Sequence, residues 1–300
     1  GHNANGQPWF RIGDYVLQGV RYENSAFMDM DLRLQAMDKA GIDFQVLSPN
    51  PLTYFHFIES PQAINFCQRH NDELQLRVAH APHRLAGLAA LPMQEITAAC
   101  DELERAVLEL GLIGAYIGTD IGRPLDSPEM DPFYEKLVAL DVPLFIHPAP
   151  AGIDGPKGDS NLNRFDLDIL TGFAAQETIA VATLIFGGVL DRHPNLSVCF
   201  SHAGGAIPML IGRLNEAGNR RPWASEALRK DGAFESYLSK LWFDAHIHDQ
   251  RVLDFAITIL GKDNLVLGTN FAGWDQHQIH GDDAWLNCLA NNARRLLRFN

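Results

Sequence analysis

Short apolar runs alternate with amphipathic stretches from about residue 30 to the end of the chain. The stretches between the runs repeat apolar positions at helical spacing, as in "ITAACDELERAVLELG" and "DPFYEKLVALD". Strands that are almost entirely apolar, each followed by a helix, are typical of a buried parallel sheet. The runs that predict strands are residues 44–48, 85–91, 113–118, 142–147, 196–202, 240–245 and 264–269.

Polar side chains gather where these predicted strands end, at Ser48, His147, His202, His246 and Asn270. A (β/α)8 barrel places its active site at the carboxyl ends of its strands. An open, doubly wound sheet would concentrate its site at one switch point instead. We therefore predict an α/β fold of the TIM-like (β/α)8 barrel class.

The strand count leaves one barrel strand to find, because a closed barrel has eight strands and the pattern shows seven. The polar opening "GHNANGQPWF" does not suit a core strand. We therefore expect the first strand to lie upstream of residue 1. No linker or change of composition marks a boundary, so we predict a single barrel domain over residues 1–300.

The composition of the chain limits which kinds of molecule it is expected to bind. The net charge of −13 argues against nucleic acid or an anionic membrane as a partner. No run of 18 or more apolar residues predicts a membrane span, and the opening lacks a signal-peptide pattern. The four cysteines are far apart and form no C-x-x-C, which favours buried free thiols. We expect a cytoplasmic protein that acts on a small molecule.

Two histidines close apolar strands. His147 ends "VPLFIH" and precedes Pro148, so its imidazole can bind a metal or form a hydrogen bond at a strand–loop junction. His202 ends "VCFSH" and precedes "AGGAIP", where two glycines let the backbone approach a bound group. This histidine can act as a general base near neutral pH, or it can belong to a structural turn.

Further candidates come from "FDAHIHDQ" and from the arginines. His246 and His248 alternate, and on a strand both would lie on one face, as a pair of metal ligands does. Because the strand gives way to a helix here, a pair divided between site and surface is an equal alternative. Arg21, Arg213 and Arg221 can pair with a substrate carboxylate, although solvated surface arginines are the ordinary case.

Several segments together resemble the amidohydrolase-2 branch of the metal-dependent hydrolase superfamily, over roughly residues 20–299. The resemblance implies a distorted (β/α)8 barrel, one divalent metal ion (commonly zinc, sometimes manganese) and a homodimer. In this branch an H-x-H on the first strand, a histidine in an "HP" motif and an aspartate after the last strand hold the metal. The segments are "QVLS", "AGLAALPMQ", "LFIHP", "VCFSHAGGAIPMLIGRL", "FDAHIHD", "GKDNLVLGT" and "NARRLL".

The resemblance assigns roles to individual residues. His147 matches the metal-binding "HP" histidine, and His202 matches the catalytic base. Arg221, in "RRP", and more loosely Arg21 match arginines that bind the substrate carboxylate. His248 matches a histidine that we interpret as structural.

The chain departs from this pattern in two places. No H-x-H occurs near its start, which agrees with the missing first strand. Asn270 stands where the metal-binding aspartate is expected, in "NFAGWD". Its amide oxygen can coordinate a metal, but it is neutral and cannot accept a proton. We expect His147 and Asn270 as the metal ligands in this chain, with Asp275 as a replacement if the loop folds back.

These observations predict a metal-assisted, non-oxidative decarboxylase of an unsaturated or aromatic carboxylic acid. His202 would pass a proton to the carbon that loses CO2, and Arg221 would hold the acid. Phe271, Trp274 and Phe55 would supply apolar walls for a flat substrate. A metal-dependent hydrolase or hydratase of a related acid or lactone is the second hypothesis. The third is a barrel that has lost its metal and only binds a ligand.

Overall fold

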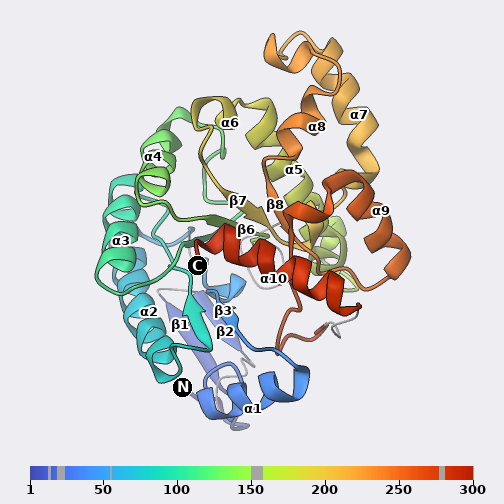
Figure 1. Ribbon diagram of the computed structural model, residues 1–300. Helices are drawn as coiled ribbons and strands as arrows, with labels where there is room; N and C mark the ends of the chain where they lie inside the picture. The colour runs from blue at the N-terminus through green and yellow to red at the C-terminus, as the bar shows by residue number, and fades with distance from the viewer. Residues whose placement is uncertain (13–14, 19–23, 55, 150–157, 277–280, 300) are drawn as a thin grey trace.

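The computed structural model describes residues 1–12, 15–18, 24–54, 56–149, 158–276 and 281–299. Its central feature is a set of parallel strands that follow one another in chain order (Figure 1). Each lies within one of the seven predicted runs, so the strand prediction is confirmed. They are β3 (Gln45–Leu47), β4 (Leu85–Gly87), β5 (Ala115–Gly118), β6 (Leu144–His147), β7 (Val198–Phe200), β8 (Trp242–Asp244) and β9 (Leu265–Val266).

Hydrogen bonding arranges these strands in two sheets. One sheet has the order β5-β6-β7-β8-β9, and the other pairs β3 with β4. A parallel bridge between Ala89 and Ala115 connects the segment after β4 to β5. Among the described residues no ladder joins β9 to β3, so the structure is α/β with parallel strands and no closed ring. The register places Gly118 beside His147, which brings the carboxyl ends of β5 and β6 to the same edge.

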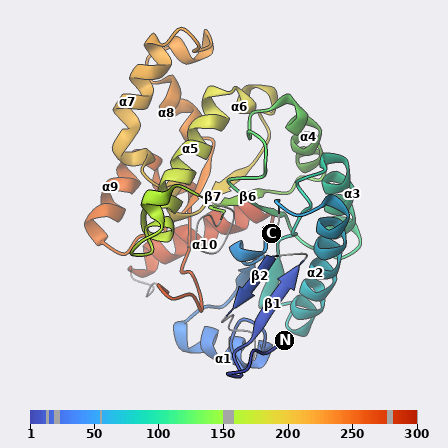
Figure 2. The ribbon, with the colours of Figure 1, turned by 180° about the vertical axis from the view of Figure 1, so that it is seen from behind.

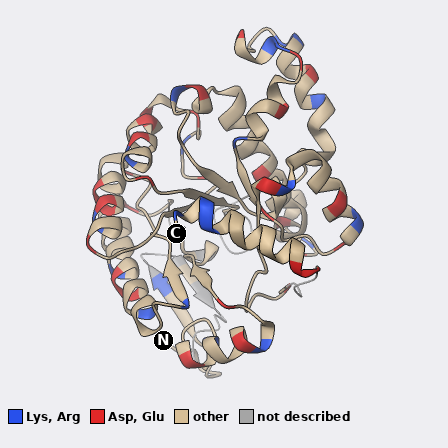
Figure 3. Ribbon diagram, in the orientation of Figure 1, with Lys and Arg blue, Asp and Glu red and all other residues tan. Residues whose placement is uncertain are grey.

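Helices connect and surround the strands. In Figures 1 and 2, α2, α3 and α4 cover one side, and α5, α7 and α9 lie on the other. Figure 3 shows that Asp, Glu, Lys and Arg lie mainly on the helices, whereas the strands are largely free of them. The helices are α1 (Met30–Ala40), α2 (Ser60–His80), α3 (Ile96–Leu108), α4 (Asp131–Ala139), α5 (Phe173–Phe186), α6 (Val189–Arg192), α7 (Ile207–Arg220), α8 (Ala233–Leu238), α9 (Gln250–Leu260) and α10 (Asp283–Leu297).

The core lies between the strands and the inner faces of these helices. Phe133, Phe200 and Phe243 are fully buried there, and burial of each such ring contributes about 2–3 kcal/mol. All four cysteines are free, and three of them are buried, as the sequence predicts. This packing gives the strand ends a rigid support.

The first residues form a separate antiparallel hairpin of β1 (Trp9–Ile12) and β2 (Tyr15–Gln18). The sequence indicates correctly that the opening is no strand of the parallel set, but it does not predict the hairpin. Polar residues surround the short apolar positions here, and they give no clear alternation.

One helical run, Asp168–Phe186, is long and apolar enough to cross a membrane by length and composition alone. It includes α5, which buries Ala180, Val181 and Leu184 in the core. Core helices of soluble proteins pass the same test, so this run by itself is weak evidence for a membrane span.

Candidate active site

Four histidines form a row across the carboxyl ends of β6, β7 and β8. The centres of the His147 and His202 rings lie 5.2 Å apart, and those of His202 and His246 lie 5.4 Å apart. His246 and His248 follow at 4.9 Å. Three strands that are distant in the sequence thus bring four imidazoles to one edge of the sheet. The sequence predicts that polar residues gather at such an edge, because they follow the predicted strands.

The turn after β7 fixes the position of His202. His202 and Ala203 have φ values of 46° and 52°, in the left-handed region, and Gly204 and Gly205 follow at 70° and 68°. A Cβ on Gly205 would overlap the carbonyl oxygen of Ala174, on α5. Glycine is therefore required at position 205, and the turn is held tightly against α5.

Glu177 of α5 is the partner of His202. Its side chain is fully buried, and its Oε1 accepts a hydrogen bond from His202 Nδ1–H at 3.1 Å. Burial raises the pKa of Glu177, against the opposing effect of His202. Burial alone would lower the pKa of His202, but the charge and hydrogen bond of Glu177, together with the charges of Asp244 and Asp275, outweigh it and raise this pKa. The pair therefore retains a proton at neutral pH, and the other ring nitrogen, Nε2, is directed away from Glu177.

His147 has the opposite electrostatic character. Its Nδ1 lies 2.9 Å from the carbonyl oxygen of Pro148, which can only accept, so Nδ1 carries the proton and Nε2 has a free lone pair. Burial, together with the neighbouring His202, lowers the pKa of His147 to about 3. A neutral imidazole with a free Nε2 lone pair is suited to bind a metal, as the sequence predicts for this residue.

The loop after β9 brings a carboxylate to the row. One candidate metal-binding group, His246, His248 and Asp275, has its ligand atoms within 4.8 Å of one another. Asn270 donates its amide N–H to Asp275 Oδ1. Burial raises the pKa of Asp275, but the Asn270 hydrogen bond and His246 outweigh this effect and the net shift is downward, so Asp275 is a carboxylate. The loop therefore folds back, and under this condition the sequence predicts that Asp275 can replace Asn270 as a metal ligand.

Three other predicted site residues that the structure describes do not join this group within one chain. Asn270 itself is exposed, with its amide directed to Asp275. Arg221 is exposed at the end of α7, about 21 Å along that helix from the His202 turn. Trp274 is 66% exposed and therefore forms no apolar wall in one chain. Arg21 and Phe55 lie outside the described residues.

Phe271 is partly buried and packs on the core, with the Arg33 guanidinium 5.3 Å from its ring centre. Sequence reasoning missed Arg33, a buried cation on α1 whose pKa burial lowers to about 10. It also missed Glu177. The signal for Glu177 was an acid within the apolar helix "AQETIAVATLIF", where a buried charge needs a partner.

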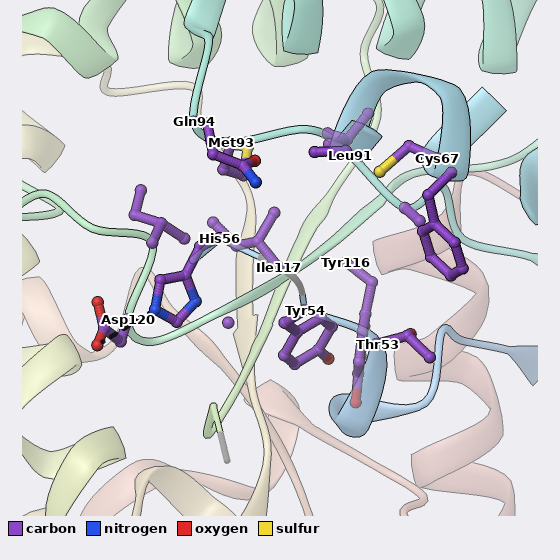
Figure 4. Close-up of a pocket in the computed structure, with 15 residues that line it drawn as sticks. Thr53, Tyr54, His56, Cys67, Leu91, Met93, Gln94, Tyr116, Ile117 and Asp120 are labelled. Carbon is purple, nitrogen blue, oxygen red and sulfur yellow. Dashed lines mark ion pairs between the residues drawn. The ribbon is translucent and has the colours of Figure 1, made fainter. Parts of the chain in front are cut away.

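A pocket lies beside the row, at the ends of β4 and β5 (Figure 4). Tyr54, His56, Tyr116 and Asp120 are among its lining residues, and His56 Nε2 lies 3.6 Å from Asp120 Oδ2. The rings of Tyr116 and His147 are 6.0 Å apart, which connects the pocket to the histidines. Aromatic rings and polar side chains thus lie together at this side of the histidines.

The sequence model of the family described as Amidohydrolase (Amidohydro_2) matches residues 25–299. The chain belongs to the amidohydrolase-2 family. This confirms the resemblance drawn from the strand-end motifs. Among the relatives of this amidohydrolase-2 chain, a 2-amino-3-carboxymuconate-6-semialdehyde decarboxylase from Dictyostelium discoideum is 35% identical over 244 residues. That match covers 81% of this chain and 66% of the relative.

Two further relatives are also decarboxylases. A gamma-resorcylate decarboxylase from Rhizobium sp. (strain MTP-10005) is 29% identical, covering 89% of this chain and 86% of the relative. The crystal structure of a dihydroxybenzoic acid decarboxylase from Polaromonas sp. JS666, with bound manganese and the inhibitor 2-nitroresorcinol, has a TM-score of 0.74. It is 25% identical and covers 90% of this amidohydrolase-2 chain and 86% of that chain. The likeness confirms the TIM-like barrel class, and these relatives support a divalent metal.

Proposed function

We propose that this protein is a metal-dependent, non-oxidative decarboxylase of an aromatic or unsaturated carboxylic acid. The observation that carries the proposal is the hydrogen bond between the buried Glu177 and the partly exposed His202, at the edge where four imidazoles meet. The relatives named above are decarboxylases. A decarboxylase of this kind needs a group that can donate a proton, here His202, next to residues that can bind a metal ion.

His202 is the proposed proton donor. The bond between the substrate carbon and its carboxylate breaks, CO2 leaves, and the electron pair of that bond stays on the carbon. That carbon takes a proton from His202 Nε2, so the carbon ends with hydrogen in place of the carboxylate. Glu177 holds the Nδ1 side of the ring and stabilises the charged imidazole. Solvent then returns the proton to the pair, and no oxidant or net water is consumed.

The residues gathered here fit the divalent ion that the family implies. The imidazoles of the row and the Asp275 carboxylate are nitrogen and oxygen donors of the kind that zinc and manganese take. When bound, such an ion supplies positive charge that holds the carboxylate of the substrate and a neighbouring oxygen. The ion is zinc or manganese, and metal analysis of the purified protein decides between them.

Aromatic surfaces favour a flat substrate. Phe173 lies 5.5 Å from the His147 ring and 6.3 Å from the His202 ring, centre to centre. With Tyr116 on the pocket side, it encloses the histidines in apolar surface that suits an aromatic ring or a conjugated chain. Arg33, which is buried, lies over the ring of Phe271. A homodimer, a single domain and a cytoplasmic location stay predictions.

The test of this function is His202→Ala. Without the proton donor, turnover of an accepted acid should fall by ~10²-fold or more while the protein stays folded. His80→Ala is the matched control, because His80 is half-exposed on α2 and, among the residues that the structure describes, pairs with Asp31. Undiminished turnover in His202→Ala, with the same dependence on metal, would remove His202 from the mechanism.

A further inference from the structure

Backbone hydrogen bonds fix the turn after β8, which carries His246 and His248. Ala245 N–H still donates to the Val266 carbonyl at 2.8 Å, which extends the β8–β9 ladder. His246 N–H then donates to Asp244 Oδ1 at 3.1 Å, and Ile247 N–H donates to the Ala245 carbonyl at 2.9 Å. The chain thus turns tightly at the sheet edge, and both histidine rings are presented on one side of it.

The loop after β9 returns a carboxylate to these rings. Asn270 and Ala272 have φ values of 45° and 65°, and Gly273 N–H donates to the Asn270 carbonyl at 2.8 Å. Ala272 N–H donates to Gln276 Oε1 at 2.8 Å. Together with the Asn270 amide, which donates to Asp275, these bonds turn the loop back on itself. Asp275 is the residue that the loop delivers to the end of β8.

The resulting spacing fits one ion. Asp275 Oδ2 lies 3.8 Å from His246 Nε2 and 3.6 Å from His248 Nε2. Two ligands of a tetrahedral ion with bonds of about 2.1 Å lie about 3.4 Å apart. Both carboxylate–imidazole distances therefore lie within a few tenths of an ångström of this spacing, and all three ligand atoms lie within 4.8 Å of one another. His246 is buried and His248 is 55% exposed, so one side remains accessible to a substrate oxygen.

We infer that His246, His248 and Asp275 form the divalent-cation site of this chain and that Asn270 positions Asp275 rather than binding the ion. The catalytic meaning of this site rests on the proposed function. Asn270 is suited to its role because its amide N–H fixes one carboxylate oxygen and leaves Oδ2 directed to the imidazoles. The residues that would hold the ion lie next to His202, whose ring is 5.4 Å from that of His246.

Metal binding to the full-length protein tests this inference without any substrate. Chelator-treated protein is titrated with Mn²⁺ and with Zn²⁺, and binding is followed by calorimetry and by the Mn²⁺ electron paramagnetic resonance signal. We expect one ion per chain in the unsubstituted protein. His248→Ala and Asp275→Asn should each weaken affinity by ~10²-fold or more, because each removes a ligand. His80→Ala should bind as the unsubstituted protein does.

A double-mutant cycle separates positioning from a general structural role. Asn270→Ala should weaken binding by ~10-fold in the unsubstituted protein but by nothing further in the Asp275→Asn background. A full additional loss in that background would overturn the positioning role. Binding as tight in both His248→Ala and Asp275→Asn as in the unsubstituted protein would overturn the site itself.

The outcomes also separate this inference from the proposed function. If His248→Ala and Asp275→Asn keep the ion while His202→Ala abolishes CO2 release, the site is wrong and the function stands. If both variants lose the ion but the protein releases CO2 from no acid, the site stands and the function is wrong. Should Asp275→Asn fail to fold, His248→Gln answers the same question, because its side chain is half in solvent.

Discussion

Two buried glutamates, one on α3 and one on α5, differ in how completely their charges are satisfied. Glu102 is 3% exposed and accepts hydrogen bonds from Asn71 at 2.7 Å and from two guanidinium nitrogens of Arg105, each at 2.9 Å. Glu177 is fully buried, and of its two oxygens only Oε1 has a hydrogen-bond partner, His202, among the described residues. A carboxylate with several fixed partners holds a fold together, whereas one that shares a proton with a partly exposed imidazole can serve chemistry.

The surroundings support this contrast. Asn71 also exchanges two hydrogen bonds with the backbone of Ala90, both at 2.9 Å, so Glu102 belongs to a network that fastens α2 and α3 to the segment after β4. Glu177 instead bonds to His202, which lies beside two further imidazoles. The first region stabilises the barrel, and the second carries the proposed reaction.

The largest expected effect is on stability at the first glutamate. Glu102→Ala should lower the free energy of unfolding by about 3 kcal/mol, because it leaves Asn71 and Arg105 without their buried partner. Denaturant unfolding measures this loss. Turnover at a temperature where the variant is folded should stay within about two-fold, and a large loss there would show that this network reaches the active site.

Substitution of Glu177, the second glutamate, should lower turnover rather than stability. Glu177→Gln keeps the shape and an acceptor for His202 Nδ1–H but removes the negative charge. Turnover should fall at least ~10-fold, less than in His202→Ala, while the free energy of unfolding changes by less than ~1 kcal/mol. Glu102→Gln is the matched control and should keep its turnover. Equal turnover in Glu177→Gln and Glu102→Gln would show that the two glutamates do not differ in their effect on catalysis.

The smallest effect is a shift in one titration. In metal-free protein the Glu177 carboxylate, with smaller contributions from Asp244 and Asp275, outweighs burial and raises the pKa of His202 to about 9, so the imidazole stays protonated through neutral pH. Without that charge, in Glu177→Gln, burial dominates and the pKa should fall below its ordinary value of about 6.5. Nuclear magnetic resonance of ¹⁵N-labelled histidine measures both values. An unchanged pKa would mean that Glu177 does not set the protonation of His202.

The contrast also shows what the sequence can reveal. Buried parallel strands are almost continuously apolar, so all seven could be found as short runs, and polar residues at their ends indicated the edge where the histidines meet. His147 and His202, whose ring centres lie 5.2 Å apart at that edge, were singled out in this way. Glu177 was not, because it lies on a helix 25 residues before His202 and no spacing rule connects the two.

The loop after β9 shows a second limit. Its fold depends on left-handed backbone conformations at Asn270 and Ala272. Alanine rarely adopts this conformation, so the sequence does not predict it at position 272. From the sequence, Asn270 therefore stood out as the ligand, whereas the structure directs its amide to Asp275. Arg221 stood out for its charge, but α7 carries it away from the histidines of the same chain.

The central claim, decarboxylation by proton transfer to carbon, is tested most directly by product analysis in D2O. Metal-loaded protein is incubated with aromatic carboxylates that carry a hydroxyl beside the carboxylate, and with unsaturated diacids. CO2 and the deuterium content of the product are measured together. The account predicts one CO2 per substrate consumed and one deuterium on the carbon that carried the carboxylate. Consumption of substrate without CO2, with water added to the product, would contradict it and establish the hydrolase or hydratase alternative.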